Sequence, residues 1–313
     1  MSLTPERMSA LVAAAGYGDD EPIAVGMRRH GAPPVEVAQG LTSCGARFTT
    51  TTTVYAASLA KQMTAACAAL LVRQGVLDMD VPLSRWMPEL PGWSATVRLR
   101  HLVHHTAALP DSWTGDRTTS GVVEELTRMP SLDDRPGTRY AYSNAGYVCL
   151  AVIMERAARR PLPEFAHDHL FRPLGMAGTR YWPGPAPAPP GVTPLTPAPL
   201  SLGDGGVWTS VRDLVRWSEA LNADELGVSA LMQAPGRLDD GTPVDYAWGM
   251  GVRSLGRHRV YRHGGGWSGL RALQARVPAL GLSVVLVAIR DDTERRGVLL
   301  DSLLDEATRL RNR

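Results

Sequence analysis

The residues with the clearest chemical potential are Ser58 and Lys61, which stand three positions apart. Lys61 is the one lysine of the chain, and the other 32 of its 33 basic Lys and Arg residues are arginines. Because arginine serves wherever only a positive charge is needed, this position is expected to require an amine, whose pKa falls readily on burial. An amine three residues after a serine lies on the same helical face. The pair is therefore predicted to be a nucleophile and the group that activates it.

The segment after Ser58 is apolar nearly all round, which is typical of a buried helix. Its apolar residues are Ala60, Ala65, Ala66, Ala68, Ala69, Leu70, Leu71 and Val72. A charged side chain at the start of such a helix is costly unless it has partners. Ser58 is therefore predicted at a helix N-terminus, where the helix dipole favours the negative charge that develops on a nucleophile.

A second candidate group is Tyr142-Ser143-Asn144, where a loop turns into a predicted helix. A phenol beside an ammonium can be held as a phenolate and act as a general base. The amide of Asn144 can hold both the lysine and a substrate carbonyl. Taken alone, the same residues also fit a helix cap next to a core tyrosine.

The third candidate is the stretch from His263 to Gly269, His-Gly-Gly-Gly-Trp-Ser-Gly, at the end of a predicted strand. Glycines on an edge strand let a substrate lie against the backbone, and an N–H there can join that of Ser58 in an oxyanion hole. The stretch also fits the dinucleotide pattern G-x-G-x-x-G. A strand follows it, however, where a helix would be needed to hold the phosphates, so no dinucleotide site is expected.

Composition excludes several function classes. The chain has 313 residues, a net charge of +2 without a basic run, and 6% aromatic residues, so nucleic acid is not an expected partner. No stretch of 18 apolar residues occurs, so no membrane-spanning helix is expected. A secretion signal is not expected either, and the protein is therefore predicted to be cytoplasmic. The three cysteines, Cys44, Cys67 and Cys149, predict buried thiols without disulfides. No cofactor is expected, and the oligomeric state is not indicated.

Three histidines have a spacing that could bind a metal on one helical face, namely His101, His104 and His105. No H-E-x-x-H pattern and no acidic partner accompany them, so we predict a structural turn and no metal. The chain also has no G-x-S-x-G pattern, which excludes the nucleophile elbow of the α/β-hydrolases.

Hydrophobic periodicity predicts one α/β (α+β) fold with a mostly helical insert. Helices are predicted over residues 1–16, 58–75, 122–129, 145–159, 210–221 and 293–311, and strands over 23–29, 35–41, 252–262, 269–277 and 282–289. No strand is predicted between residues 82 and 199, and the proline-rich segment 183–199 is predicted to be extended. Residues 1–80 and 200–313 are therefore assigned to an antiparallel sheet flanked by helices, and residues 81–199 to the insert, with the active site in the cleft between them.

With these motifs, the sequence resembles the serine hydrolases that include class C β-lactamases, D-alanine carboxypeptidases, D-aminopeptidases and esterases with a β-lactamase fold. The motifs that carry the resemblance are Ser58-x-x-Lys61, 75–80 (Gly-Val-Leu-Asp-Met-Asp), 102–106 (Leu-Val-His-His-Thr), Tyr142-Ser143-Asn144, 173–176 (Pro-Leu-Gly-Met), 205–210 (Gly-Gly-Val-Trp-Thr-Ser) and 263–266 (His-Gly-Gly-Gly). The resemblance implies a β-lactamase/transpeptidase-like fold. Three catalytic motifs occur in the order that the family shows.

The resemblance also implies roles for individual residues. Ser58 is the implied nucleophile, Lys61 and Tyr142 its activating pair, and Asn144 a polar support. The backbone N–H groups of Ser58 and Gly266 are the implied oxyanion donors. We add His263 to the catalytic candidates, and Gly265 and Trp267 to the residues predicted to line the substrate site.

Two departures from the family pattern bear on the reaction. His263 stands where β-lactamases usually have a lysine, and a largely neutral imidazole attracts a carboxylate less than an ammonium does. Ala107 and Ala108 replace the usual Ser-Gly after His105-Thr106. At most weak β-lactam hydrolysis is therefore expected.

The predicted function is a serine hydrolase that cleaves a small ester, or an amide, through an acyl-enzyme on Ser58. Its expected partner is a small acyl substrate. Two alternatives stay open at this stage. One is an acyltransferase that passes the acyl group to an amine or alcohol, and the other is a catalytically silent binding protein on the same scaffold. Sequence does not separate hydrolysis from transfer, because that choice depends on the shape and desolvation of the cleft.

Overall fold

The computed structural model describes residues 3–111, 117–184, 189–192 and 195–309. Its largest element is a six-stranded antiparallel sheet with the strand order β2-β1-β9-β8-β7-β6. The strands are β1 (Ile23–Arg29), β2 (Val35–Gln39), β6 (Gly251–Leu255), β7 (His258–Trp267), β8 (Leu270–Val277) and β9 (Leu282–Ala288). The first strand of the chain, β1, pairs with the last strand, β9, so both ends of the sequence contribute to one sheet.

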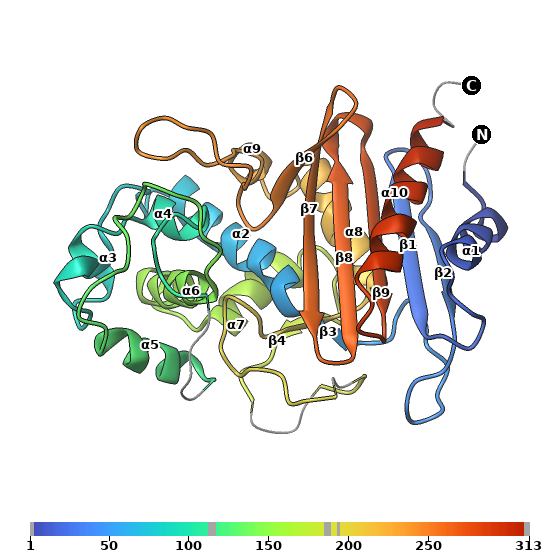
Figure 1. Ribbon diagram of the computed structural model, residues 1–313, viewed down its shortest axis with the longest axis horizontal. Coiled ribbons are helices and arrows are strands. Elements are labelled where there is room, and N and C mark those ends of the chain that lie inside the picture. Colours follow the sequence, from blue (N-terminus) through green and yellow to red (C-terminus); the bar gives the residue numbers. More distant parts are fainter. Residues whose placement is uncertain (1–2, 112–116, 185–188, 193–194, 310–313) are drawn as a thin grey trace.

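Helices cover both faces of this sheet, as Figure 1 shows for α10 in front and α8 behind. Helices α1 (Pro5–Ala14) and α10 (Glu294–Arg309) share an apolar core with one face. Helices α2 (Ala60–Arg73) and α8 (Val211–Asn222) share a second core with the other. Because both faces are covered, every residue of β9 is buried. The predicted fold class is confirmed.

A group of helices lies beside the sheet, at the end remote from both termini (Figure 1). It consists of α3 (Leu83–Trp86), α4 (Leu99–Val103), α5 (Thr119–Thr127), α6 (Asn144–Ala158) and α7 (Leu162–Ala166), with single turns at Gly92–Ala95 and His167–Phe171. Helix α9 (Ser229–Met232) lies in the later connection to β6. Helices α2 and α6 are buried along most of their length and pack in the same core. This packing brings the Ser58 and Tyr142 motifs together.

A small second sheet corrects the prediction that residues 82–199 contain no strand. It has the order β3-β5-β4 and consists of β3 (Val54–Tyr55), β4 (Arg180–Tyr181) and β5 (Val207–Thr209). Strand β4 is two residues long, which is too short to show an alternating pattern in the sequence. The sheet matters for the site because β3 leads directly into the turn that carries Ser58.

The strand predicted over 252–262 is in fact a hairpin. The chain turns at Gly256, which has a φ of 55°, and β6 and β7 pair on either side of it. The glycine-rich motif therefore lies within β7 and not after its end. The β6–β7 register ends at the Gly251–Arg262 pair, so β7 continues past β6 from His263 to Trp267 and presents a sheet edge there.

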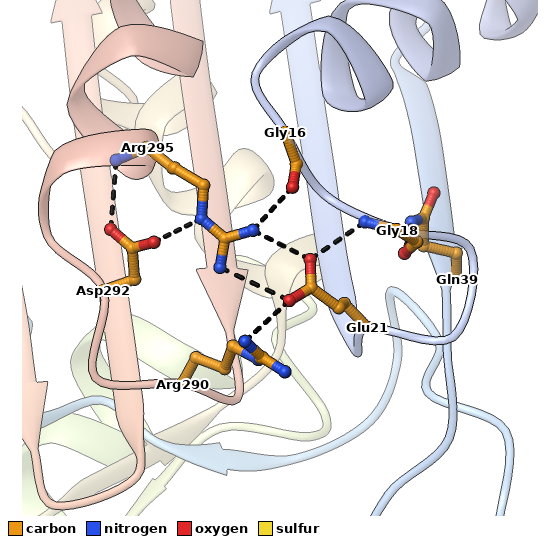
Figure 2. Close-up of polar contacts among 7 residues, drawn as sticks. All are labelled: Gly16, Gly18, Glu21, Gln39, Arg290, Asp292 and Arg295. Carbon is orange, nitrogen blue, oxygen red and sulfur yellow. Dashed lines mark hydrogen bonds and ion pairs between the residues drawn. The ribbon is translucent and has the colours of Figure 1, made fainter.

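Ion pairs tie the loop after α1 to the start of α10 (Figure 2). The Arg295 guanidinium donates to a Glu21 carboxylate oxygen at 2.9 Å, and Arg290 pairs with the other oxygen at 2.8 Å. Arg295 also pairs with Asp292, and Glu21 accepts from the backbone N–H of Gly18 at 2.9 Å. The first turn of α10 is therefore held in a fixed position against the N-terminal loop.

The proline-rich segment 183–199 lies partly outside the described residues. In the part that is described, the Val192 N–H donates to the Thr53 carbonyl at 2.9 Å, and the Leu195 N–H donates to the Ser268 carbonyl at 2.9 Å. The segment thus contacts both the approach to Ser58 and the turn after β7. Over the described part of the chain, none of the helices combines the length and the apolar character needed to cross a membrane.

Candidate active site

Ser58 lies in a single 3-10 turn, Ala57–Leu59, between β3 and α2. Ala57 has a φ of 47°, a left-handed conformation that is uncommon for a residue with a side chain. Such strain persists only where the surroundings enforce it, and it is often found at functional sites. Leu59 and Ala60 are buried, whereas Ser58 is half-exposed, so its hydroxyl can meet a substrate.

Strand β7 approaches this turn very closely at Gly265. A Cβ atom at Gly265 would lie 2.3 Å from the Ala56 carbonyl oxygen, a distance that no side chain tolerates. Glycine is therefore required for β7 to reach the turn. Gly265 itself is buried and has a packing role here, and its predicted place in the substrate site stays a prediction. Its neighbour Gly266 is exposed, and the oxyanion role of Ser58 and Gly266 stays a prediction.

Lys61 is fully buried and makes three hydrogen bonds from three parts of the fold. Its Nζ donates to Ser58 Oγ at 3.2 Å, to Asn144 Oδ1 at 2.6 Å and to the Asp204 carbonyl oxygen at 2.9 Å. An ammonium has three N–H donors, so the three acceptors satisfy it completely. The predicted contact between Lys61 and Ser58 is confirmed.

The surroundings of Lys61 make its neutral form accessible. Burial lowers the pKa of Lys61 to about 8, while the carboxylates of Asp204 and Asp111 act in the opposite direction. A lysine with such a pKa releases its proton near neutral pH, which an arginine does not do. The amine can therefore take a proton from Ser58.

Tyr142 lies between the lysine and two histidines. Lys61 Nζ is 4.9 Å from the centre of its ring, the His105 ring centre is at 4.3 Å, and the His263 ring centre is at 6.0 Å. Burial raises the pKa of Tyr142, and its interaction with the Ser58 side chain opposes that rise only in part. The phenol is thus favoured over the phenolate that the sequence suggested, and the catalytic role of Tyr142 stays a prediction.

Asn144 is the first residue of α6, and its amide is held at both ends. Its Oδ1 accepts from Lys61, while its Nδ2 donates at 3.0 Å to the carbonyl and to the carboxylate of Asp111. The helix cap is made by Ser143, whose hydroxyl accepts from the Gly146 N–H at 3.0 Å. The predicted contact of Asn144 with the lysine and the predicted helix cap are therefore both present, and the catalytic roles of Tyr142 and Asn144 stay predictions.

His263 is a neutral residue at the edge of the site. Its Nδ1 lies 2.7 Å from the Gly264 carbonyl oxygen, so the ring carries its proton on that nitrogen. Burial, helped by the charge of Lys61, lowers the pKa of His263 to about 4. A neutral imidazole supplies no positive charge at this edge of the site.

Trp267 lies at the end of β7. Its indole N–H donates to the Thr196 carbonyl at 3.0 Å, and the Arg117 guanidinium lies 5.5 Å from its ring centre. These contacts fix the ring beside the 195–199 segment. Its predicted role in substrate binding stays a prediction.

Sequence reasoning missed Asp204. The segment 201–206 is buried throughout and runs behind Lys61, to which the Asp204 carbonyl accepts. Burial raises the pKa of the Asp204 carboxyl, and the charge of Lys61 opposes that rise. A signal was present, because Asp204 stands between glycines. A Cβ at Gly203 would lie 2.3 Å from the Tyr147 carbonyl oxygen, so this segment needs glycine to pack closely.

His105 was also missed as a site residue. It has a φ of 57°, and its Nδ1 accepts from the Ser143 N–H at 3.1 Å. Its ring therefore supports both Tyr142 and the start of α6. Histidines 101 and 104 have other partners, since His101 Nδ1 accepts from the Arg98 N–H and His104 Nδ1 lies 3.2 Å from the Tyr246 carbonyl oxygen. Among the described residues, no group of His, Cys, Asp and Glu could hold a metal.

The prediction of buried thiols is correct for two of the three cysteines. Cys67 and Cys149 are buried and free, whereas Cys44 is free and exposed. The thiol of Cys44 contacts the Thr42 hydroxyl at 3.1 Å.

Together, the fold and the contact of Ser58 with a buried lysine are those of a serine hydrolase. The sequence profile described as Beta-lactamase matches residues 12–309, and the chain belongs to that family. The resemblance found in the sequence motifs is confirmed.

Named relatives share the family but differ in length. The chain is 30% identical to penicillin-binding protein 4* of Bacillus subtilis over 70% of its own length and 57% of that protein. It is 26% identical to the D-alanyl-D-alanine-carboxypeptidase/endopeptidase AmpH of Escherichia coli, over 81% of this chain and 75% of that one. The fold is similar to D-amino acid amidase from Ochrobactrum anthropi, with a TM-score of 0.80 and 20% identity over 97% of this chain and 99% of that chain.

Proposed function

We propose that the chain is an ester hydrolase that acts on small carboxylic esters through an acyl-enzyme on Ser58. The observation that carries the proposal is the environment of Lys61, a buried amine with a lowered pKa, 3.2 Å from the serine hydroxyl. This arrangement has the elements of an activated nucleophile. It also counts against a catalytically silent protein, because a buried cation without a function would be costly.

In the first step, neutral Lys61 takes the hydroxyl proton while Ser58 Oγ attacks the ester carbonyl. The negative charge on the carbonyl oxygen would be stabilised by the N–H groups of Ser58 and Gly266. Collapse of this intermediate breaks the bond to the leaving alcohol. The proton passes from Lys61 through the Tyr142 phenol to the leaving oxygen, which departs as a neutral alcohol.

In the second step, water enters in place of the alcohol and attacks the acyl-enzyme. The same residues work in reverse, so Tyr142 and Lys61 take the proton from water, and Ser58 recovers its proton when the acid leaves. Asn144 keeps its bond to Lys61 throughout and so maintains the position of the amine.

The neutral state of His263 favours simple esters over β-lactams. Penicillins and cephalosporins carry a carboxylate close to the scissile bond, and a nearby ammonium would attract it. With a pKa of about 4, His263 supplies no such charge at neutral pH. Recognition of β-lactams should therefore be weak.

Amide hydrolysis in the same site is a second candidate, favoured by the names of relatives. One relative is a carboxypeptidase/endopeptidase and others are D-aminopeptidases, all of which cleave amide bonds. The chain spans 49% of one D-aminopeptidase at 27% identity, so the substrates of that enzyme do not transfer directly to this chain.

Two buried thiols and one free exposed thiol support the proposal that the protein works in the reducing cytoplasm.

A comparison of matched substrates tests the proposed function. We expect a short-chain aryl ester to be hydrolysed with a kcat/KM at least about 100-fold above that of the anilide with the same acyl group. The same difference is expected relative to benzylpenicillin. This factor is the smallest rate contribution expected from one general acid or base. A faster anilide would make the chain an amidase. If none of the three substrates reacted, the result would favour the catalytically silent alternative.

Product analysis separates hydrolysis from acyl transfer. Adding an amine or alcohol to the ester reaction is expected to leave free acid as the main product. An ester or amide product that grows with acceptor concentration, at the expense of acid, would show that the chain is an acyltransferase.

Ester hydrolysis should rise with pH through a midpoint near 8. The reason is that the lowered pKa of Lys61, about 8, is the point above which its amine is neutral and can accept a proton. His263, with a pKa of about 4, is neutral throughout this range, and the pKa of Tyr142 is raised above its usual value. Values of kcat/KM, determined from initial rates between pH 6 and 9, give the midpoint.

The control for this profile is His263→Gln, which should keep the midpoint even if the rate falls. A midpoint near 6 that disappears in His263→Gln would transfer the proton-accepting role to the histidine. A profile without any rise across this range would show that Lys61 does not change its charge there, which would contradict a pKa near 8.

A further inference from the structure

The carboxylate of Asp204 is buried beside the lysine of the site. It belongs to the residue whose backbone carbonyl accepts from Lys61 Nζ at 2.9 Å, and this residue is only 8% exposed. Its Oδ1 is buried and has no hydrogen-bond partner in the part of the chain that the structure describes. A buried carboxylate is costly unless a nearby positive charge compensates it. Lys61 is the cation whose charge acts on Asp204.

The turn that carries Asp204 is fixed against its surroundings on both sides of this residue. Before it, the Gly203 carbonyl accepts from the Thr64 hydroxyl at 2.8 Å, and Thr64 lies one turn after Lys61 on α2. After it, a Cβ atom at Gly205 would lie 2.4 Å from the Tyr55 hydroxyl, so the turn packs closely against β3. These contacts define the position of Asp204 relative to Lys61.

A second carboxylate near Lys61, that of Asp111, differs in its exposure. Asp111 is exposed, and it reaches the lysine through Asn144, whose Nδ2 donates to its carboxylate at 3.0 Å. Water and salt screen an exposed charge, whereas a buried charge keeps more of its effect. Burial lowers the pKa of Lys61, and the charge of Asp204 opposes this more strongly than that of Asp111 does.

The other titratable groups around Lys61 are two phenols and two imidazoles. Lys61 Nζ lies 4.9 Å from the ring centre of Tyr142 and 5.7 Å from that of Tyr147. Burial raises the pKa of both phenols, which keeps them protonated. Burial and the charge of Lys61 lower the pKa of His105 and of His263, which keeps both rings neutral. None of these four groups can compensate an ammonium.

We propose that the Asp204 carboxylate is the counter-ion of the Lys61 ammonium, which makes Asp204 a positioning residue that acts on the reaction through Lys61. The inference rests on the proposed function, in which neutral Lys61 takes the proton of Ser58. That step creates a positive charge without access to solvent, and its acceptors are neutral oxygens of Ser58, Asn144 and the Asp204 backbone. A carboxylate held nearby stabilises this charge as it forms.

The single lysine of the chain allows a direct test by nuclear magnetic resonance. Protein labelled isotopically at the lysine ε carbon gives one lysine resonance, whose shift with pH reports the pKa of Lys61. The parent protein should titrate near pH 8. In Asp204→Asn the ammonium loses its counter-ion, so this pKa should fall by about one unit. Asp204→Ala keeps the same backbone carbonyl and should shift the pKa in the same direction.

Two matched variants and a circular dichroism spectrum of each protein control this titration. Asp111→Asn removes the exposed carboxylate and should lower the pKa of Lys61 by less than Asp204→Asn does. Asp301→Asn changes an exposed carboxylate on α10 and should leave the resonance unchanged. A larger fall in Asp111→Asn would assign the counter-ion to Asp111. An unchanged pKa in folded Asp204→Asn and Asp204→Ala would overturn the proposal.

The parent protein decides the question if neither Asp204 variant folds. A buried pair is screened little, so the pKa of Lys61 should stay near 8 at low and at high salt. A pKa that falls with added salt would assign the attraction to exposed Asp111 and contradict the proposal.

Ester kinetics on the same variants link the counter-ion to the reaction. In Asp204→Asn, kcat/KM should reach its plateau at a lower pH, and the plateau should be about threefold to tenfold lower, because a weaker base takes the Ser58 proton less readily. The resonance titration needs no turnover, so the two proposals can fail separately. A lowered Lys61 pKa in Asp204→Asn, with a parent protein that cleaves no ester, would refute the esterase and keep the counter-ion. Ester turnover with an unchanged pKa would do the reverse.

Discussion

Lys61→Arg is expected to fold normally and to lose about 100- to 10,000-fold in kcat/KM, the range of a general-base contribution. The substitution keeps the positive charge and adds donors. Three acceptors nevertheless surround Lys61 Nζ at 2.6 to 3.2 Å, in a space with no exposure to solvent. A guanidinium is longer and planar, and it does not release its proton at accessible pH. It can neither hold its charge at the same point between these acceptors nor accept the proton of Ser58.

Ester kinetics on the purified variant, with circular dichroism to show folding, measure this loss. Arg73→Lys is the matched control, because it makes the reverse exchange at an exposed position on the same helix and should keep parental activity. If the variant kept more than about a tenth of the parental kcat/KM, its loss in rate would be smaller than the smallest general-base contribution. The role given to Lys61 would then be wrong.

The Ser58–Lys61 pair could be predicted from sequence because the relevant distance is local. Residues three apart at the start of a helix face the same side, so spacing alone placed the amine beside the hydroxyl. The composition added the second clue, a single lysine among arginines. The structure then supplied the contact of 3.2 Å.

The contact between Lys61 and Asn144 joins residues 83 positions apart, and no periodicity reveals such a pair. The family resemblance brought Tyr142 and Asn144 into the site, because their motif could be matched as a unit. The protonation state of Tyr142 could not be predicted in the same way. It depends on burial, which outweighs the effect of the Ser58 side chain in raising its pKa.

Asp204 shows what sequence leaves out. It accepts from Lys61 through its backbone carbonyl, and its carboxylate also favours the charged form of Lys61. Every residue has a backbone carbonyl, so the residue type gave no indication of the hydrogen bond. The two-residue strand β4 was missed because it is too short to show alternation.

Ser58→Ala should abolish ester turnover, with a loss of up to about a million-fold, as for other nucleophiles whose removal disables a whole catalytic set. The variant removes one oxygen and keeps the helix, since Leu59 and Ala60 carry the buried contacts of this turn. Lys61 would keep two of its three acceptors, Asn144 and the Asp204 carbonyl, so the fold should be preserved. Rates measured beside a circular dichroism spectrum distinguish loss of chemistry from loss of structure.

Covalent labelling tests the central claim, an acyl-enzyme on Ser58, most directly. The protein is treated with a serine-reactive aryl phosphonate, its intact mass is measured, and the modified peptide is mapped. The account predicts one adduct per chain, on Ser58, and no adduct in Ser58→Ala. An adduct on Ser143, Ser268 or another serine, with Ser58 unmodified, would contradict it.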